Sequence, residues 1–185
     1  MDNNYSYKGG IRNKKKVGYG IEITNDHEYK GNFLNDQKKG EGEITILKTN
    51  DKFVGEFKDN KMFHGAFTWK VNNNVYNGFF ENNKMHGEGT YTYSSGNQNM
   101  FIGNYKNGKK HGHGIIKENG KEIYKGEFIE GTPHGKGFRY DKNGDKIEIE
   151  MDKGKVTKNK ENSSAGISKN KSAAKIGLSN YFLFF

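Results

Sequence analysis

The chain has 185 residues, a net charge of +9 and 29% charged side chains, which is long enough for one ordinary domain with a tail. It has no Cys, no apolar leader in MDNNYSYKGG and no apolar run of the roughly 20 residues that a membrane-spanning helix needs. Disulfides and thiolate metal sites are therefore excluded, and we expect a cytoplasmic protein. The 13 Phe, 11 Tyr and 26 Gly residues argue against disorder and predict a core of rings lying against bare backbone.

A pattern of aromatic residues and glycines recurs about every 23 residues. Counted from a first aromatic residue at position 0, Gly follows at +2, an aromatic residue at +4, and Gly at +11 and +13. The stretch YNGFFENNKMHGEGTY, which begins at Tyr76, shows the whole pattern. Copies begin at residues 7, 29, 53, 76, 101 and 124, and a fading seventh copy begins at Ile147. Six copies with five fixed positions exclude a chance origin.

In chain order, the pattern predicts a lead followed by six repeats and a tail. The predicted segments are 1–6 (lead), 7–28, 29–52, 53–75, 76–100, 101–123 and 124–146 (repeats), 147–154 (partial repeat or cap) and 155–185 (basic linker and apolar end). The positions that carry the pattern are Tyr7, Gly9, Gly18 and Gly20; Tyr29, Gly31, Phe33, Gly40 and Gly42; Phe53, Gly55, Phe57 and Gly65; Tyr76, Gly78, Phe80, Gly87 and Gly89; Phe101, Gly103, Tyr105, Gly112 and Gly114; Tyr124, Gly126, Phe128, Gly135 and Gly137. In the third repeat we interpret Phe63 as an insertion, with Phe67 in place of the second Gly.

The spacing within a repeat predicts a β-hairpin. Positions 0, +2 and +4 share one face of a strand, as do +11, +13, +15 and +17 on a second strand, because side chains alternate with period two. About five turn-forming residues separate the two strands. The glycines are expected to face aromatic rings of a neighbouring strand, so that each ring lies flat on the backbone. Since a lone hairpin is only marginally stable, the hairpins are expected to stack.

The pattern Y-x-G-x-F-x-x-G-x-x-x-G-x-G, well preserved in YKGEFIEGTPHGKG over residues 124–137, resembles the MORN (membrane occupation and recognition nexus) repeat. The resemblance covers residues 7–146, with a partial copy to about 154. It implies an all-β fold, an elongated twisted antiparallel sheet of stacked hairpins with a shallow trough. Ile11 in place of an aromatic residue, Gly missing at +7 in four repeats, and Phe63 depart from the family pattern.

Several chemical sites are disfavoured by their setting. The GxG pairs open strands, whereas a phosphate-binding loop opens a helix, so we expect no nucleotide site. His86, His111 and His134 fall at +10 of successive repeats, about 10 Å apart, too far to share a metal ion. We find no catalytic triad or acid–base pair, and we expect neither a cofactor nor an enzyme.

Lysines recur at the predicted hairpin tips and form the candidate binding site. We expect them along one edge of the sheet, where they would face an anionic membrane. A solvated turn is the ordinary alternative, and nucleic acid, which would need the packing aromatics as stacking platforms, is disfavoured. The candidate residues are Lys14, Lys15, Lys16, Lys38, Lys39, Lys61, Lys84, Lys109 and Lys110.

The end of the chain leaves two interpretations open. Ile147–Met151 is expected to be an open edge strand, which favours a homodimer through the C-terminal edge. Alternatively, the apolar segment 176–185 covers that edge. The resemblance implies a non-catalytic adaptor or scaffold that binds unidentified proteins at membranes or cytoskeletal structures. The alternatives are phosphoinositide or acidic-lipid binding through the lysines, or a regulatory fragment of a lipid-kinase-type enzyme.

Overall fold

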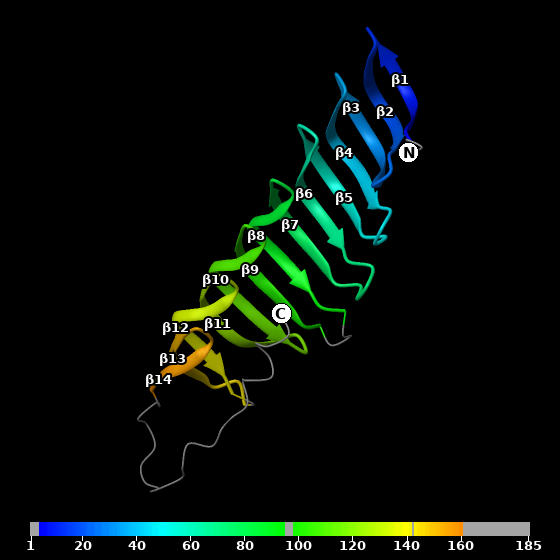
Figure 1. The fold of residues 1–185 in the computed structure, drawn as a ribbon. Helices are drawn as coiled ribbons and strands as arrows, with labels where there is room; N and C mark the ends of the chain where they lie inside the picture. The colour runs from blue at the N-terminus through cyan, green and yellow to red at the C-terminus, as the bar shows by residue number, and fades with distance from the viewer. Residues whose placement is uncertain (1–3, 95–97, 142, 161–185) are drawn as a thin grey trace, which may run out of the picture.

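The computed structural model describes residues 4–94, 98–141 and 143–160, which form one antiparallel sheet of 14 strands (Figure 1). The strands lie side by side in chain order, so every strand pairs only with its neighbours in sequence. The predicted all-β sheet of stacked hairpins is thereby confirmed. The strands are β1 (Ser6–Arg12), β2 (Lys15–Ile23), β3 (His27–Leu34), β4 (Gln37–Ile46), β5 (Lys52–Lys58), β6 (Lys61–Thr68), β7 (Val75–Glu81), β8 (Lys84–Thr92), β9 (Met100–Lys106), β10 (Lys109–Glu118), β11 (Lys121–Ile129), β12 (Thr132–Tyr140), β13 (Lys146–Asp152) and β14 (Lys155–Lys160).

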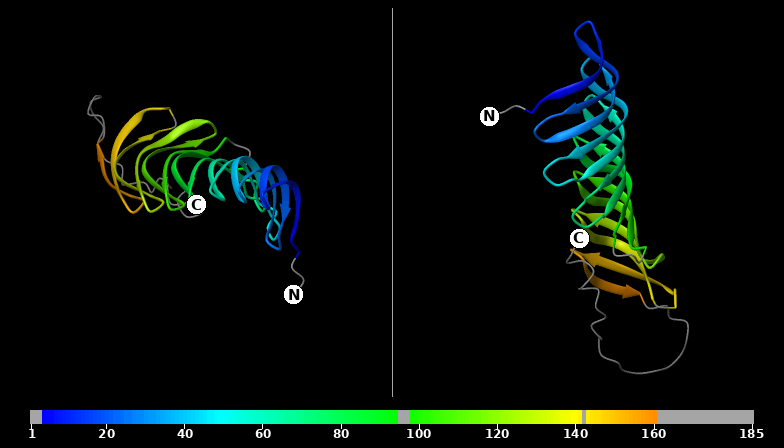
Figure 2. Two further views of the ribbon diagram at one scale, coloured as in Figure 1. Left: turned by 90° about the horizontal axis from the view of Figure 1, so that it is seen from above. Right: turned by 90° about the vertical axis from the view of Figure 1, so that its right-hand side faces the viewer.

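The sheet is a long, twisted ribbon whose hairpins are bent across their length (Figure 2). The bend gives the single layer a concave face and a convex face. Among the described residues, no helix is present that would be long and apolar enough to cross a membrane. The trough on the concave face is the feature that positions the candidate site.

The hairpin tips are two-residue turns in which both residues have positive φ. Asn82 and Asn83, for example, have φ of 50° and 60°. Turns of this handedness match the twist of the flanking strands, and Asn and Asp tolerate the left-handed conformation. The Asn83 side chain also accepts a hydrogen bond from the backbone N–H of Met62 in the preceding hairpin at 3.1 Å. In this repeat, position +7, where the family has Gly, is therefore occupied by an Asn residue that joins adjacent hairpins.

The core is a continuous ladder of aromatic rings on the concave face. Tyr29 at position 0 lies edge-to-face with Phe33 of its own hairpin, with ring centroids 5.1 Å apart, and with Phe57 of the next hairpin at 5.0 Å. The same two contacts recur along the array to the pair Tyr124–Phe128. Each such pair contributes about 0.5–1.5 kcal/mol beyond the area it buries. The ladder lets one sheet bury a core without a second layer.

The glycines of the pattern have two different roles. At +2 and +13 the position-0 ring covers the backbone of its own hairpin: a Cβ atom on Gly42 would lie 2.6 Å from the Tyr29 hydroxyl oxygen. At +11 the prediction of a covering ring is wrong. A Cβ atom on Gly40 would meet nothing within 4 Å, but Gly40 has φ of +75°. The +11 glycine is needed for this left-handed conformation, because the second strand bulges there while the first does not.

The third repeat contains a deletion, and its interpretation as an insertion is wrong. Gly55 pairs with Gly65 across the hairpin, as the +2 glycine pairs with the +13 glycine elsewhere. Gly65 is therefore the second Gly, and the repeat lacks the +11 residue. Phe67 pairs with Phe53 in the place that Tyr91 takes in the fourth repeat. The prediction that Phe67 replaces the second Gly is wrong for the same reason.

The seventh repeat is a complete hairpin, which corrects the predicted boundary at residue 154. The strand β13 pairs with β14, and residues 155–160 belong to the sheet. Ile149 stands at +2 and is buried. A side chain is possible at this +2 position because position 0 is Ile147, which has no ring to cover the backbone. The predicted apolar end at 176–185 lies outside the described residues.

Candidate functional site

The concave face has one repeated frame and three variable positions. Position +9 pairs across the hairpin with the +4 ring, as Lys38 pairs with Phe33, so its side chain lies on the concave face. Positions +15 and +17 lie on the same face toward the connecting loops, because they continue the alternation from +13. Differences among the repeats at these three positions decide what the trough offers to a partner.

The predicted row of nine lysines divides between two parts of the molecule. Lys16, Lys38 and Lys110 all stand at +9 and lie on the concave face, where Lys38 is only 9% exposed. Their assignment to the hairpin edge is wrong, because the two-residue turn pairs +9 with the buried ring at +4 and so places it on the concave face. The lysines that remain exposed at the tips or beside them are Lys14, Lys15, Lys39, Lys61, Lys84 and Lys109.

Two of the exposed lysines bind neighbouring tips. Lys61 donates to the Asn82 side chain at 2.8 Å, and Lys109 forms an ion pair with Glu130 at 2.6 Å. These contacts run from one hairpin to the next along the edge. Of these two charges, that of Lys109 is neutralised by a carboxylate of the neighbouring tip.

The N-terminal part of the trough holds a cluster of charges that pair with one another. Glu22, at +15 and 7% exposed, contacts Lys16 and accepts from Lys38 at 2.8 Å, and Lys38 Nζ lies 2.9 Å from His27 Nε2. Burial alone would raise the pKa of Glu22, but the bonds from the two lysines outweigh it and the pKa is lowered. We call these four residues the charged cluster.

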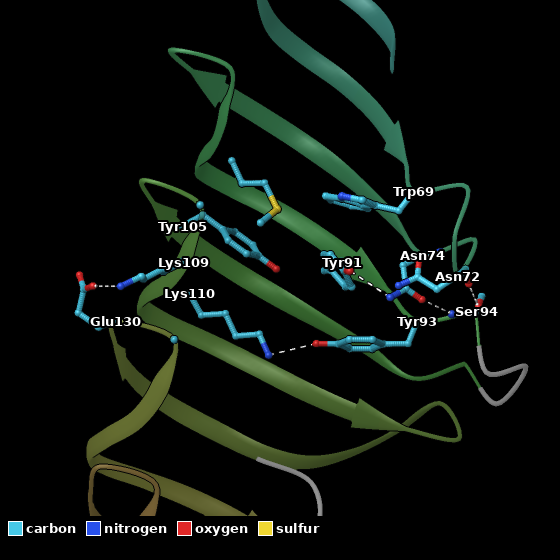
Figure 3. Close-up of a pocket in the computed structure, with 13 residues that line it drawn as sticks. Trp69, Asn72, Asn74, Tyr91, Tyr93, Ser94, Tyr105, Lys109, Lys110 and Glu130 are labelled. Atoms are coloured by element: carbon cyan, nitrogen blue, oxygen red, sulfur yellow. Dashed lines mark hydrogen bonds and ion pairs between the residues drawn. The ribbon is translucent and has the colours of Figure 1, made fainter. Parts of the chain in front are cut away.

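The central part of the trough holds a pocket of about 840 Å³ whose lining includes four aromatic side chains, Trp69, Tyr91, Tyr93 and Tyr105 (Figure 3). Trp69 and Tyr91 have ring centroids 5.3 Å apart, and Tyr91 and Tyr93 follow at 4.8 Å. Asn74, in the connecting loop before β7, donates from Nδ2 to the Tyr91 hydroxyl at 3.0 Å. The rings of Trp69, Tyr91 and Tyr93 are all half-buried. We call this site the aromatic pocket.

Lys110 brings a positive charge to the aromatic pocket. Its Nζ atom donates to the Tyr93 hydroxyl at 3.1 Å and lies 5.0 Å from the centre of the Phe101 ring (Figure 3). Burial lowers the pKa of Lys110 to about 8, because the ammonium ion loses hydration. Burial also raises the pKa of Tyr93 above its usual value, so that hydroxyl keeps its proton near neutral pH.

Tyr105 places a hydroxyl group in the same pocket. The residue is 4% exposed, and its hydroxyl oxygen has no hydrogen-bond partner among the described residues. The other ring residues at +4, such as Phe80 and Phe128, have no hydroxyl group. The ring of Tyr105 packs in the ladder, and its hydroxyl points into the pocket (Figure 3). An unsatisfied buried hydroxyl is costly, which marks this position for a ligand.

The other candidates from the sequence are held apart by the fold. His86 Nδ1 lies 3.1 Å from Glu81, and His134 Nδ1 lies 3.4 Å from Asp152, each within its own part of the edge. Within residues 4–94, 98–141 and 143–160, no three His, Asp or Glu side chains are close enough to hold a metal ion. The GxG pairs lie in strands, as expected.

The aromatic pocket was not predicted from the sequence. A comparison of the repeats at their variable positions contains the signal: Trp69, Tyr91 and Tyr93 are the aromatic residues nearest the connecting loops, and Tyr105 breaks a row of Phe at +4. The deletion in the third repeat hides the register of Trp69. A position-by-position comparison that allows for this deletion would have found the cluster.

Comparison with known protein families agrees with the architecture. The MORN repeat model matches residues 7–27, 29–45, 76–98, 101–120 and 124–146, which together cover more than half of the chain. The third repeat, with its deletion, lies outside the matched segments, as does the seventh hairpin. A search of curated proteins found no significant match. The chain therefore belongs to the MORN repeat family.

Proposed function

We propose that the protein is a non-catalytic adaptor that binds a partner protein in the trough on its concave face. The aromatic pocket carries this proposal, because it offers half-exposed Trp and Tyr rings at the centre of the array. Aromatic residues of this kind dominate the binding energy of protein interfaces when they lie in a well-packed hollow. A rigid sheet also presents them without the entropy cost of ordering a loop.

The experiment is capture of partners from native cells with matched variants of the full chain. Trp69→Ala combined with Tyr91→Ala removes two rings of the pocket, and we expect it to lose the partners that the wild type recovers. Phe79→Ala is the control, because Phe79 is 43% exposed and lies in the same repeat on the convex face. Loss of partners in the control but not in the pocket variant would place the interface elsewhere. Thermal melts of each variant check that the fold is retained.

Binding of acidic lipid by the exposed lysines is the second candidate function. The observation that favours it is that Lys15, Lys61, Lys84 and Lys109 share position +8 and repeat along one edge. Replacing the six exposed edge lysines by Gln should abolish sedimentation with anionic liposomes, and wild-type binding should weaken with salt. Wild-type protein that never sediments at low salt would eliminate this candidate.

We further propose a cytoplasmic location, at membranes or cytoskeletal structures. Dimerisation through the C-terminal edge remains a prediction, but the strand on which it was based is not an edge, since β13 pairs with β14. The outer strand β14 carries lysines such as Lys155 and Lys158, which oppose pairing with a like strand. Scattering from the full chain and from a truncation after Lys160 measures the oligomeric state and whether residues 161–185 affect it.

A further inference from the structure

One row of side chains crosses the concave face from the first hairpin to the last. Residues at position 0 and at +15 lie directly opposite each other on neighbouring strands, so their side chains form a continuous line across the sheet. In the C-terminal half the row consists of Tyr91, Phe101, Ile116, Tyr124, Arg139 and Ile147. The row therefore joins the aromatic pocket, at Tyr91, to the C-terminal end of the trough.

The charged residues of this row, between Tyr7 and Ile147, are Glu22 and Arg139. Glu22 forms ion pairs with lysines of the charged cluster. Arg139, by contrast, forms no ion pair within residues 4–94, 98–141 and 143–160. Its Nε atom is buried and has no hydrogen-bond partner in the same part of the chain. Because a buried donor without an acceptor is costly, the trough at Arg139 favours a ligand that supplies an acceptor.

The residue type at position +15 of the sixth repeat indicates which acceptor fits. The chain has 31 Lys and Arg residues, and Arg12 and Arg139 are the two Arg residues among them. Ile44 and Ile116 stand at +15 in other repeats, so the packing of the array does not require a cation there. A guanidinium group presents a planar fork of N–H donors that matches a carboxylate through two parallel hydrogen bonds.

The shape of the trough favours a protein partner over a membrane. Arg139 is half-buried and lies on the concave face of a sheet whose hairpins are bent across their length (Figure 2). The flat surface of a membrane would meet the rims of this trough first, whereas an extended chain can lie along it. Acidic membranes are also bound by clusters of Lys and Arg, and the neighbours of Arg139 in the row, Tyr124 and Ile147, are uncharged.

The distance from the aromatic pocket to Arg139 sets the length of the segment that can contact both. Tyr91 in β8 and Arg139 in β12 are separated by four strand steps along the row. Neighbouring strands lie about 4.8 Å apart, so the two residues are about 19 Å apart along the trough. An extended chain, which rises about 3.3 Å per residue, covers this distance with about six residues. Ile116 lies between them and is half-buried, which continues the apolar surface.

We propose that the trough binds an extended segment of a partner protein in which an aromatic residue and an Asp or Glu residue stand about six positions apart. The aromatic side chain packs against Trp69 and Tyr91 in the aromatic pocket, and the carboxylate accepts two hydrogen bonds from the guanidinium group of Arg139. This inference rests on the proposed adaptor function and names the chemistry of the partner.

The single Trp of the chain is a built-in probe, because Trp69 lines the pocket. Its fluorescence is followed while the full chain is titrated with acetyl-Phe-Gly-Ser-Gly-Ser-Gly-Asp-amide, with the peptide of reversed order, and with the Asn counterpart of each. We expect saturable binding at about millimolar concentrations, with the Asp form of one order bound about fivefold more tightly than its Asn form. Added salt should weaken this preference. Removal of the spacer should abolish it, because a carboxylate next to Phe cannot reach Arg139.

Arg139→Ile is the matched variant, because Ile already occupies position +15 in two other repeats. It should remove the preference for Asp and leave the affinity for the Asn peptide unchanged. Arg139→Lys should retain part of the preference, since Lys keeps the charge without the planar fork. Lys136→Gln is the control: it removes the same charge from an exposed residue of the same hairpin and should change neither value. Thermal melts check that each variant is folded.

Several results would overturn the proposal. If the Asp and Asn peptides bound equally in both orders, or if the preference persisted in Arg139→Ile, Arg139 would not hold the carboxylate. If no peptide changed the fluorescence, the aromatic side chain would not enter the pocket. A response to phosphatidylserine vesicles without a response to peptides would assign the trough to lipid.

Capture of partners from native cells separates this inference from the adaptor function. A partner that is lost from the variant with Trp69→Ala and Tyr91→Ala, yet retained by Arg139→Ile, would contradict this inference and leave the adaptor function intact. The expected peptide preference, with no partner captured by the wild type, would support the chemistry of the trough and count against the adaptor function.

Discussion

The charged cluster and the aromatic pocket use the same repeat position for opposite purposes. Lys38 and Lys110 both stand at +9, both pair across the hairpin with the +4 ring, and both have the ammonium group over a ring of the ladder. In the cluster, the charge of Lys38 is balanced by Glu22 at 2.8 Å. In the pocket, Lys110 donates a hydrogen bond to the hydroxyl of Tyr93 at 3.1 Å.

The comparison shows what a repeat frame permits. The ladder determines where the +9 side chain lies, and the residues at +15 and +17 determine which groups lie beside its ammonium group. Glu22 stands at +15 near Lys38, whereas Tyr91 and Tyr93 occupy +15 and +17 near Lys110. The charged cluster is therefore joined by ion pairs to a carboxylate at +15, whereas aromatic side chains at +15 and +17 lie near the ammonium group in the aromatic pocket.

Removal of Glu22 should have the largest effect on stability. Glu22→Ala leaves Lys16 and Lys38 facing each other in a buried place, which should cost about 3–5 kcal/mol of the free energy of unfolding. The combined change of Lys16 and Lys38 to Met and of Glu22 to Ile should cost much less, because Met62 and Ile44 already occupy such positions. Denaturant unfolding measures both. If both variants lost the same free energy of unfolding, the ion pairs themselves would stabilise this part of the sheet, and unpaired lysines would not be the cause of the loss in Glu22→Ala.

The ring ladder, which both regions share, comes next. Gly114→Val places a side chain against the Phe101 ring and should cost about 1–3 kcal/mol or more. Gly112→Val should also destabilise, but through its φ of +68°, since the nearest atom to a Cβ there is 3.7 Å away.

Asparagine separates the two causes, because Asn tolerates the left-handed conformation. Gly112→Asn should retain most of the stability, whereas Gly114→Asn should lose it. If Gly112→Asn and Gly112→Val melted at the same temperature, backbone conformation would not be the reason for the +11 glycine.

Substitution of Lys110 should stabilise the fold. The pKa of Lys110 is about 8 in the folded chain and near 10.5 when unfolded, so the unfolded state binds more protons between these values. The contribution of Lys110 to the free energy of unfolding is therefore least favourable below pH 8, and it becomes more favourable as the pH rises toward 10.5. Lys110→Met should therefore raise the free energy of unfolding at pH 7 by about 1–3 kcal/mol, with a smaller gain at pH 10. A gain that did not depend on pH would rule out desolvation as its cause.

The smallest effect is expected from His27 in the charged cluster. Burial and the charge of Lys38 lower the pKa of His27 from 6.5, and outweigh the opposing effects of Glu22 and Asp26. The unfolded chain then takes up a proton more readily, so stability should be full above pH 6.5 and fall as the pH drops through that value. The loss of stability that comes from protonation of Glu22 should begin only below about pH 4.5.

His27→Gln should remove the upper of these two steps in a series of melts at different pH values. His113→Gln, on an exposed residue, is the control. A pH step near 6.5 that persists in His27→Gln would come from another group.

The sequence predicted the fold well because each fixed position of the repeat has a packing requirement that only certain residues meet. A ring at position 0 needs bare backbone beneath it at +2 and +13, so Tyr29 predicts the glycines at 31 and 42, and their spacing predicts the hairpin. Where the ring is lost, the rule is relaxed, as at Ile149. Two predictions that rested on spacing alone are wrong. The third repeat has one residue fewer between its strands' glycines, not an inserted residue. Residues 155–160 form a strand of the sheet and do not belong to a linker.

The candidate site was predicted less well, because the face on which a side chain lies depends on the strand register. Counting along the chain places Lys38 and Lys110 on the edge with Lys39 and Lys109, but +9 pairs across the two-residue turn with the +4 ring and therefore lies on the concave face. The sequence by itself determined the repeat, the hairpins and the packing of rings on glycine backbone, because these recur at fixed positions in each copy. Only the tertiary structure decided which groups surround each lysine at +9 and which ring residues meet in a pocket, because those contacts depend on the strand register and on positions that differ from one repeat to the next.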